Sequence, residues 1–114
     1  MMIPQERNKI LGMVNYKNTN DLIGAFLSGG GDGFSGTSLA LSNTRIIGNQ
    51  IVHFGTVILE RDNSSIIFNQ TNYSFQTSRL QKSILSLIKD KKFVSVKNVP
   101  MGYRGSLADF QKKQ

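Results

Sequence analysis

The feature that most constrains the fold is a change of hydrophobic period within residues 50–88. Residues 50–61 are rich in β-branched and aromatic side chains, which favour a β-strand. Short polar turns separate this run from an apolar run at residues 65–68 and from an alternating segment at residues 73–75. Strands that are joined by such short turns pair antiparallel. We therefore expect three antiparallel strands in this part of the chain.

From Ser78 onward the apolar residues recur at helical spacing. Ser78 is a good N-cap residue and Gln81 follows three positions later, which makes a capping box. The apolar stripe of this helix consists of Leu80, Ile84, Leu87 and Ile88. The opposite side carries Arg79, Lys82, Ser86 and Lys89. Because a small sheet needs a cover to be stable, we expect the apolar stripe to lie on the sheet.

The segments on either side of this unit are shorter. Residues 1–36 predict an N-terminal arm, a short helix over residues 20–28 and a glycine-rich loop over residues 28–36. Further strands are expected at residues 37–42, 45–47 and 93–97, and a terminal helical turn at residues 107–111. The predicted fold class is therefore α+β, a small antiparallel β-meander packed against one main amphipathic helix, with a short N-terminal helix. Residues 37–114 would form a single core domain.

Length and composition exclude several classes of protein. A chain of 114 residues suits one domain, and the absence of cysteine excludes disulfides and thiolate metal sites. No apolar run approaches the roughly 20 residues that span a bilayer. The N-terminus lacks the basic-then-apolar order of a signal peptide. These observations predict a cytoplasmic protein without membrane attachment.

Charge is distributed unevenly along the chain. Residues 1–78 contain five basic and five acidic residues, whereas residues 79–114 contain nine basic and two acidic ones, so the whole net charge of +7 lies in the last third. A field this one-sided favours an anionic partner, which could be nucleic acid, an anionic membrane surface or an acidic protein. The alternative interpretation is that the lysines reflect a base-composition bias of the genome. The candidate anion-binding residues are Arg79, Lys82, Lys89, Lys91, Lys92, Lys97 and Arg104.

We find no catalytic or metal-binding pattern. His53, the only histidine, lies inside an apolar run and lacks a second metal ligand, and sequence alone leaves open whether Glu60 or Asp62 folds back to it. Gly31, Gly33 and Gly36 match a dinucleotide-binding spacing, but a helix precedes them and a strand follows, which is the reverse of what that motif requires. We therefore predict a protein that is not an enzyme and uses no cofactor.

A short set of motifs is similar to a small domain of unknown function found in tailed-phage and mobile-element proteins. The matching residues are His53, Thr56, Val57, Ile58, then Ile66, Ile67, Phe68, Asn69, and finally Tyr73, Thr77, Ser78 and Arg79. Thr56 stands one place late, and Phe75 replaces a threonine. The resemblance covers about a third of the chain and implies a phage-like origin and a small antiparallel sheet with a helix. It implies no activity and no catalytic residue.

Two functions follow as hypotheses. The first is a non-enzymatic basic module that contacts nucleic-acid phosphates without sequence specificity. The second is a phage-encoded interaction protein, either an inhibitor of a host protein or a self-assembling component, which would bind through a sheet edge and could form a homo-oligomer there. Its candidate contacts are Phe34 in the glycine-rich loop, Tyr73 and Tyr103.

Overall fold

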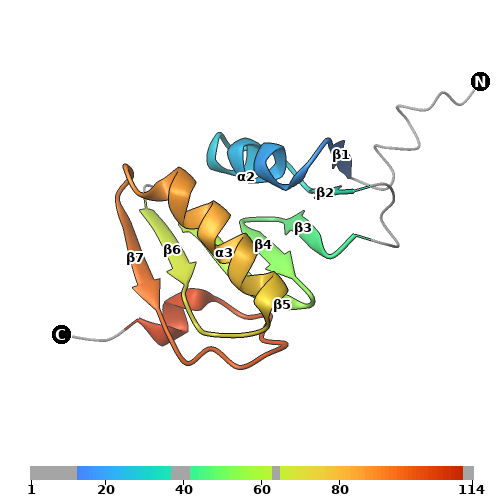
Figure 1. Cartoon of the computed structure of the whole chain (residues 1–114). Coiled ribbons are helices and arrows are strands. Elements are labelled where there is room, and N and C mark those ends of the chain that lie inside the picture. The colour runs from blue at the N-terminus through green and yellow to red at the C-terminus, as the bar shows by residue number, and fades with distance from the viewer. Residues whose placement is uncertain (1–12, 37–41, 63–64, 112–114) are drawn as a thin grey trace, which may run out of the picture.

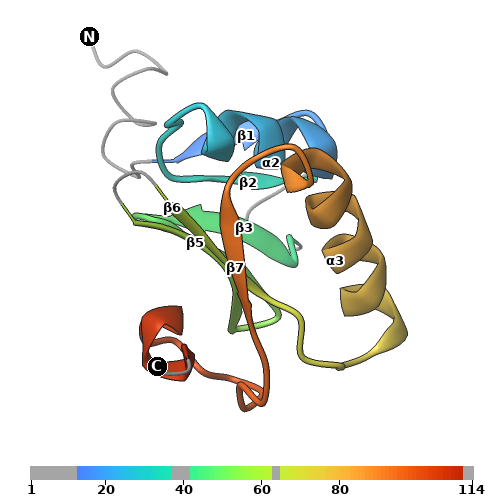
Figure 2. The same cartoon turned by 90° about the vertical axis from the view of Figure 1, so that its left-hand side faces the viewer.

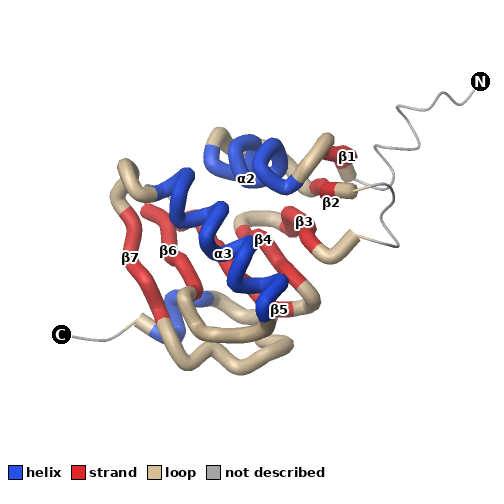
Figure 3. The backbone as a smooth tube through the Cα atoms, in the orientation of Figure 1, coloured by secondary structure: helices blue, strands red, loops and turns tan. Residues whose placement is uncertain are grey.

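One seven-stranded sheet organises the protein, and the strands stand side by side in the order in which they occur in the chain (Figure 1). The computed structural model describes residues 13–36, 42–62 and 65–111. The strands are β1 (Val14–Tyr16), β2 (Gly33–Ser35), β3 (Thr44–Ile47), β4 (Gln50–His53), β5 (Thr56–Asp62), β6 (Ser65–Asn69) and β7 (Phe93–Val96). The helices are α2 (Thr19–Leu27), α3 (Phe75–Ile88) and the 3-10 helix η1 (Leu107–Phe110) (Figure 3).

The sheet is mixed, so the predicted antiparallel meander packed against one main helix is wrong. Strands β2 to β6 do pair antiparallel, each with its neighbour in sequence. At the two edges, however, β1 pairs parallel with β2, and β6 pairs parallel with β7. Parallel neighbours need a crossover connection, and α2 and α3 provide the two crossovers. The described residues therefore form two principal helices, one in each β-α-β unit.

Both principal helices cover the same face of the sheet (Figure 2). The strands β1, β2, β6 and β7 all run in the same direction, and both crossovers step to the next strand in the same sense. Crossovers of the same hand must then place their helices on the same side. The side chains of Leu22, Ile23 and Phe26 from α2 meet Leu80, Ile84 and Ile88 from α3 in one core over this face.

A register shift in β5 supplies extra apolar surface to this core. Ile51 pairs with Leu59 and Val52 pairs with Val57, so Ile58 has no partner in β4. The bulge allows both Ile58 and Leu59 to join the core beneath the helices, although adjacent residues of a regular strand face opposite sides. Val57 and Val52 face the other side.

The C-terminal segment, residues 97–111, covers this second face (Figure 2). Val99 and Leu107 are almost fully buried there against Val52, Val57 and Ile67. Buried Glu60 attaches the segment, because its carboxylate accepts hydrogen bonds from Leu107 N (2.7 Å), Ser106 Oγ (2.8 Å) and Gln50 Nε2 (3.1 Å). The predicted terminal helical turn is confirmed as η1 with Ser106 as its N-cap.

The segment of residues 13–36 contributes β1 and β2 to the same sheet. Helix α2 begins after Asn18, whose Oδ1 accepts a hydrogen bond from Asp21 N at 2.8 Å, close to the predicted boundary. The predicted glycine-rich loop is shorter than expected, because Gly33–Ser35 forms β2. A Cβ at Gly33 would lie 2.4 Å from the Tyr16 ring and 2.5 Å from Val14 O, so only glycine permits β1 and β2 to approach this closely.

The single strand predicted over residues 50–61 is in fact the hairpin of β4 and β5. The chain reverses at Phe54 and Gly55, which both have positive φ angles, of 50° and 77°. Two residues with positive φ form the tight turn that matches the twist of a hairpin. Asparagine and glycine normally mark such a turn, and an aromatic residue at its first position hid the turn in the sequence.

Helix α3 begins four residues earlier than predicted. Ser74 is its N-cap, and the Ser74 hydroxyl accepts a hydrogen bond from Thr77 N, so the predicted strand over residues 73–75 and the cap at Ser78 are both wrong. Gln81 is not part of a capping box, because its buried Nε2 donates to Asn69 O (2.8 Å) and Thr71 O (2.9 Å). Of the predicted apolar stripe, Leu87 is exposed, and the other three residues are buried.

Candidate functional site

The outward face of α3 gathers cations beside an aromatic ring. At about 100° per residue, Phe75, Arg79, Lys82, Ser86 and Lys89 fall within an arc of about 80°. All five are exposed, and Phe75 is 77% exposed. The Arg79 guanidinium lies 6.0 Å from the centroid of the Phe75 ring. We call these five residues the α3 basic face.

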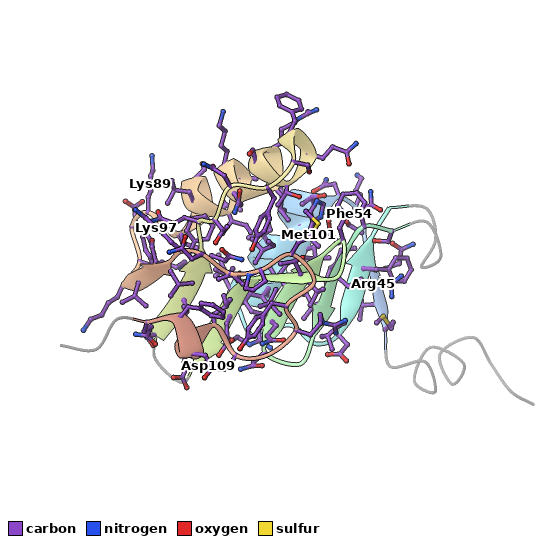
Figure 4. The ribbon with its side chains drawn as sticks, turned by 90° about the horizontal axis from the view of Figure 1, so that it is seen from below. Arg45, Phe54, Lys89, Lys97, Met101 and Asp109 are labelled. Atoms are coloured by element: carbon purple, nitrogen blue, oxygen red, sulfur yellow. The ribbon has the colours of Figure 1, made fainter. Side chains whose placement is uncertain are left out.

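Two more of the predicted anion-binding lysines extend this face at one end. Lys91 and Lys92 follow the last turn of α3 and are exposed. Lys97 comes after β7 and Arg104 lies in the C-terminal segment, where it lines a hollow with Arg45. Figure 4 shows Lys89 and Lys97 at the end of the molecule opposite to Phe54 and Met101. The structure thus brings five of the seven predicted cations together.

The cations of the α3 basic face have no anionic partner within the described part of the chain. The only recorded side-chain interaction of Arg79 is the one with the Phe75 ring, and Lys82 and Lys89 have none. Arg61, by contrast, has an internal role. Its guanidinium donates to the carbonyls of Phe26, Gly30 (3.1 Å) and Gly48 (3.3 Å), and it lies 4.4 Å from the Phe26 ring centroid.

The three predicted partner contacts lie in structured positions. Phe34 is half-buried in β2, where it pairs with Asn15 and Arg45, and is not at a loop tip. The Tyr73 hydroxyl donates to Val99 O and accepts from Asn69 Nδ2 at 3.0 Å.

The third contact, Tyr103, is held by its own segment. Its hydroxyl donates to Asp109 Oδ2 at 2.7 Å and lies 3.1 Å from Ser106 O. The hydrogen bond to the Asp109 carboxylate, followed by burial and nearby negative charge, raises the pKa of Tyr103 above 10.0. Both tyrosine hydroxyls therefore already have internal partners.

His53 is the most unusual polar group in the described core. The side chain is 7% exposed at the end of β4, and its Nδ1 lies 2.9 Å from Thr44 Oγ1. Its Nε2 is buried and has no hydrogen-bond partner among the described residues. An unpaired buried acceptor or donor costs about 1–3 kcal/mol, so such groups are rare in folded proteins.

Burial favours the neutral form of the ring. It lowers the pKa of His53 below 6.5, and a hydrogen bond with the Asn43 backbone acts in the opposite direction. Nδ1 faces the Thr44 hydroxyl, which can donate or accept, so the tautomer decides whether Nε2 is a donor or an acceptor. In either tautomer, Nε2 is the ring nitrogen that has no partner among the described residues.

A mainly apolar cavity of about 270 Å³ lies against His53. It opens between the β4–β5 turn, the first turn of α3 and the C-terminal segment. The residues that line it are His53, Phe54, Thr56, Tyr73, Ser74, Gln76, Thr77 and Met101. Phe54 and Met101 are 50% and 73% exposed at its opening, and Figure 4 shows them beside each other. We call this cavity the His53 pocket.

The geometry does not arrange His53 as one member of a catalytic triad. A general-base histidine is usually oriented by a carboxylate, whereas Nδ1 here faces the Thr44 hydroxyl. Glu60 bonds to the C-terminal segment on the other face, and Asp62 lies at the far end of β5. No group of three or more metal-ligating side chains occurs in the described ranges.

Among the pocket residues, only Tyr73 was a predicted contact. Gln76 and Met101 belong to no motif, and only the fold brings them to His53. Gly55 was the one available signal, because it interrupts an otherwise continuous apolar run.

The described residues contain no helix of sufficient length and apolarity to span a bilayer. The chain matches no protein family, no curated protein and no solved structure in comparisons with each.

Proposed function

We propose that the protein is a non-enzymatic module that binds single-stranded nucleic acid along α3. The observation that supports the proposal best is the α3 basic face, in which three cations and the exposed Phe75 ring share one stripe. Cations that track a phosphate backbone beside an aromatic side chain are the usual composition of a surface for single strands. Lys91 and Lys92 extend the path beyond the helix.

The length of the helix sets the scale of the contact. Fourteen residues at 1.5 Å per residue extend over about 21 Å, which is room for several nucleotides. Contacts would be made mainly to phosphates, so affinity would depend little on sequence and strongly on salt. For five phosphate contacts, a slope of about −0.7 per contact reduces affinity roughly a hundredfold between 50 and 200 mM salt.

The test is fluorescence anisotropy with a single-stranded DNA of about 12 nucleotides at several salt concentrations. The combined variant Arg79→Gln, Lys82→Gln, Lys89→Gln should lower the magnitude of the salt slope by about 2. A matched control, Lys17→Gln, Lys97→Gln, Arg104→Gln, removes the same charge from exposed positions elsewhere. Equal losses in the two variants would indicate attraction by net charge alone and would refute a site on α3.

The open edge of β7 favours a second candidate, a protein partner that adds a strand to the sheet. No described strand pairs with the outer side of β7, and Val94 is partly exposed there. A groove of about 400 Å³ runs beside it, lined by Val94, Lys97 and Phe110 among others. This mode suits a phage-type interaction protein or a homo-oligomer. Val94→Lys should abolish such pairing, as measured by light scattering, while leaving DNA binding intact.

A further inference from the structure

The His53 pocket has the properties of a binding site that no internal side chain fills. It is concave and mainly apolar, and one of its lining residues is His53, whose buried Nε2 has no partner among the described residues. Ligand sites commonly combine apolar walls with a few polar groups that fix orientation. A ligand with a hydrogen-bonding group that reaches Nε2 would satisfy the unpaired atom. Such a ligand carries hydrogen-bonding groups on an otherwise apolar or aromatic body.

The backbone at the pocket opening supports a functional role for Phe54. Its φ of 50° is a conformation that bulky residues rarely adopt, and asparagine or glycine would occupy it with less strain. Strain of this kind persists at ligand sites when the side chain is needed there. The Phe54 ring packs edge-on against the His53 ring, with 4.6 Å between centroids. Because Phe54 is half-exposed on the turn, a rotation of its side chain would not disturb the packed core.

The pocket adjoins the α3 basic face. Ser74, Gln76 and Thr77 belong to the start of α3 and line the pocket, and Phe75 and Arg79 stand on the outer side of the same turn. A strand of nucleic acid that passes Arg79 would thus bring its bases to the pocket opening.

We propose that the His53 pocket binds one unstacked nucleobase of the strand held by α3, an inference that rests on the function proposed above. Every nucleobase carries both N–H donors and acceptors on its edge, so it can pair with Nε2 in either tautomer of His53, and the exposed Gln76 amide can both donate to and accept from the same edge. The Phe54 ring, once moved outward, and the Met101 thioether would pack against the base. Apolar walls suit the flat faces of the base, while its sugar and phosphate remain outside.

The first experiment tests the pocket without phosphates. His53 is the only histidine, so its ring nitrogens give unambiguous ¹⁵N resonances. Titration of the protein with each of the four free nucleosides should move the Nε2 resonance saturably for at least one. The Phe54→Asn variant, which suits the turn, should weaken this response. An Nε2 resonance that no nucleoside moves would overturn the inference, whatever the outcome with DNA.

The second experiment separates the pocket from the phosphate contacts. It compares a single-stranded oligonucleotide with an abasic strand of equal length at one salt concentration. Phe54→Asn should weaken binding of the intact strand by roughly 5- to 100-fold, the range for one stacked base, and leave binding of the abasic strand unchanged. Leu85→Ala, which truncates an exposed apolar residue elsewhere on α3, is the control and should change neither.

The outcomes distinguish the two proposals. In one outcome, both strands bind with equal, salt-sensitive affinity, and Phe54→Asn changes neither affinity. This outcome would support the α3 interface and refute the base pocket. If neither strand binds but a nucleoside moves the Nε2 resonance, the α3 proposal fails and the pocket remains as a site for free nucleosides.

Discussion

Replacement of Glu60 tests how the C-terminal segment is attached to the sheet. The carboxylate is 4% exposed and accepts three hydrogen bonds, from Leu107 N, Ser106 Oγ and Gln50 Nε2. In Glu60→Gln the amide oxygen still accepts from Leu107 N and Gln50, and the amide nitrogen can donate to Ser106 Oγ. Only the contribution of the charge is lost, so we expect a decrease of about 1–2 kcal/mol in the free energy of unfolding.

Glu60→Ala should lower the free energy of unfolding further, because it leaves a buried N–H donor without an acceptor. Gln50 retains its bond to Gly105 O, and Ser106 retains its bond from Ala108 N, but the buried amide of Leu107 has no other acceptor. An unsatisfied buried donor costs about 1–3 kcal/mol, and two weakened bonds add about 1 kcal/mol each, which gives about 3–5 kcal/mol. This is a large part of the 5–15 kcal/mol typical of a domain.

Urea denaturation of both variants, with hydrogen exchange at the Leu107 amide, measures the effect. If the Leu107 amide exchanges faster than the amides of the core beneath the helices, the loss of stability lies in the C-terminal segment. Asp62→Ala, at the exposed end of the same strand, is the control. If Glu60→Ala is no less stable than Glu60→Gln, the carboxylate does not hold the segment and the reasoning is refuted.

Three further changes test other parts of the structure by denaturation. Arg61→Lys should lower the free energy of unfolding by about 1–2 kcal/mol, because the single nitrogen of lysine cannot reach the separate carbonyls that the branched guanidinium bonds and loses the stacking on Phe26. An unchanged value would contradict the internal role of Arg61. Because the folded pKa of His53 lies below 6.5, the unfolded chain binds the proton more readily than the folded protein does. The free energy of unfolding should therefore be highest above pH 6.5 and decrease as the pH falls below that value. His53→Gln should remove this part of the pH dependence. Phe54→Asn should raise the free energy of unfolding by up to about 1 kcal/mol through relief of the positive-φ strain, and a clear loss of stability would show that the ring contact outweighs the strain.

The sequence predicted elements better than their connections. Helical spacing predicted the position of α2 to within about two residues and the side of α3 that faces the core. The reason is that Leu22, Phe26, Ile84 and Ile88 follow a 3.6-residue period. The β6–β7 pairing could not be deduced in the same way. Periodicity shows that Phe93–Val96 is a strand, but only the crossing of α3 decides that it returns parallel to β6.

Competition between neighbouring cap residues explains the error at the start of α3. Ser74 and Ser78 are both good cap residues, and Ser74 is used because Gln81 is occupied in bonds to the carbonyls of Asn69 and Thr71. The strand Val14–Tyr16 lies in the predicted N-terminal arm and was not predicted, because three residues are too few to show a period. The strand expected at residues 37–42 falls almost wholly outside the described residues.

The candidate site was predicted in part. The shared face of the α3 cations follows from helical geometry, so the sequence alone predicts it. The His53 pocket was not predicted, because Met101 lies far from His53 in sequence and reaches it only when the C-terminal segment crosses the second face.

The order of the strands has a consequence for synthesis on the ribosome. Because every strand pairs with its neighbour in sequence, the sheet can assemble from the N-terminus as the chain emerges, without waiting for a distant partner. The second face is the exception. Val52, Val57 and Ile67 stay uncovered until Leu107 has left the exit tunnel, long after their strands have been made. A nascent chain stalled after β7 would expose this apolar surface and should be a target for chaperones.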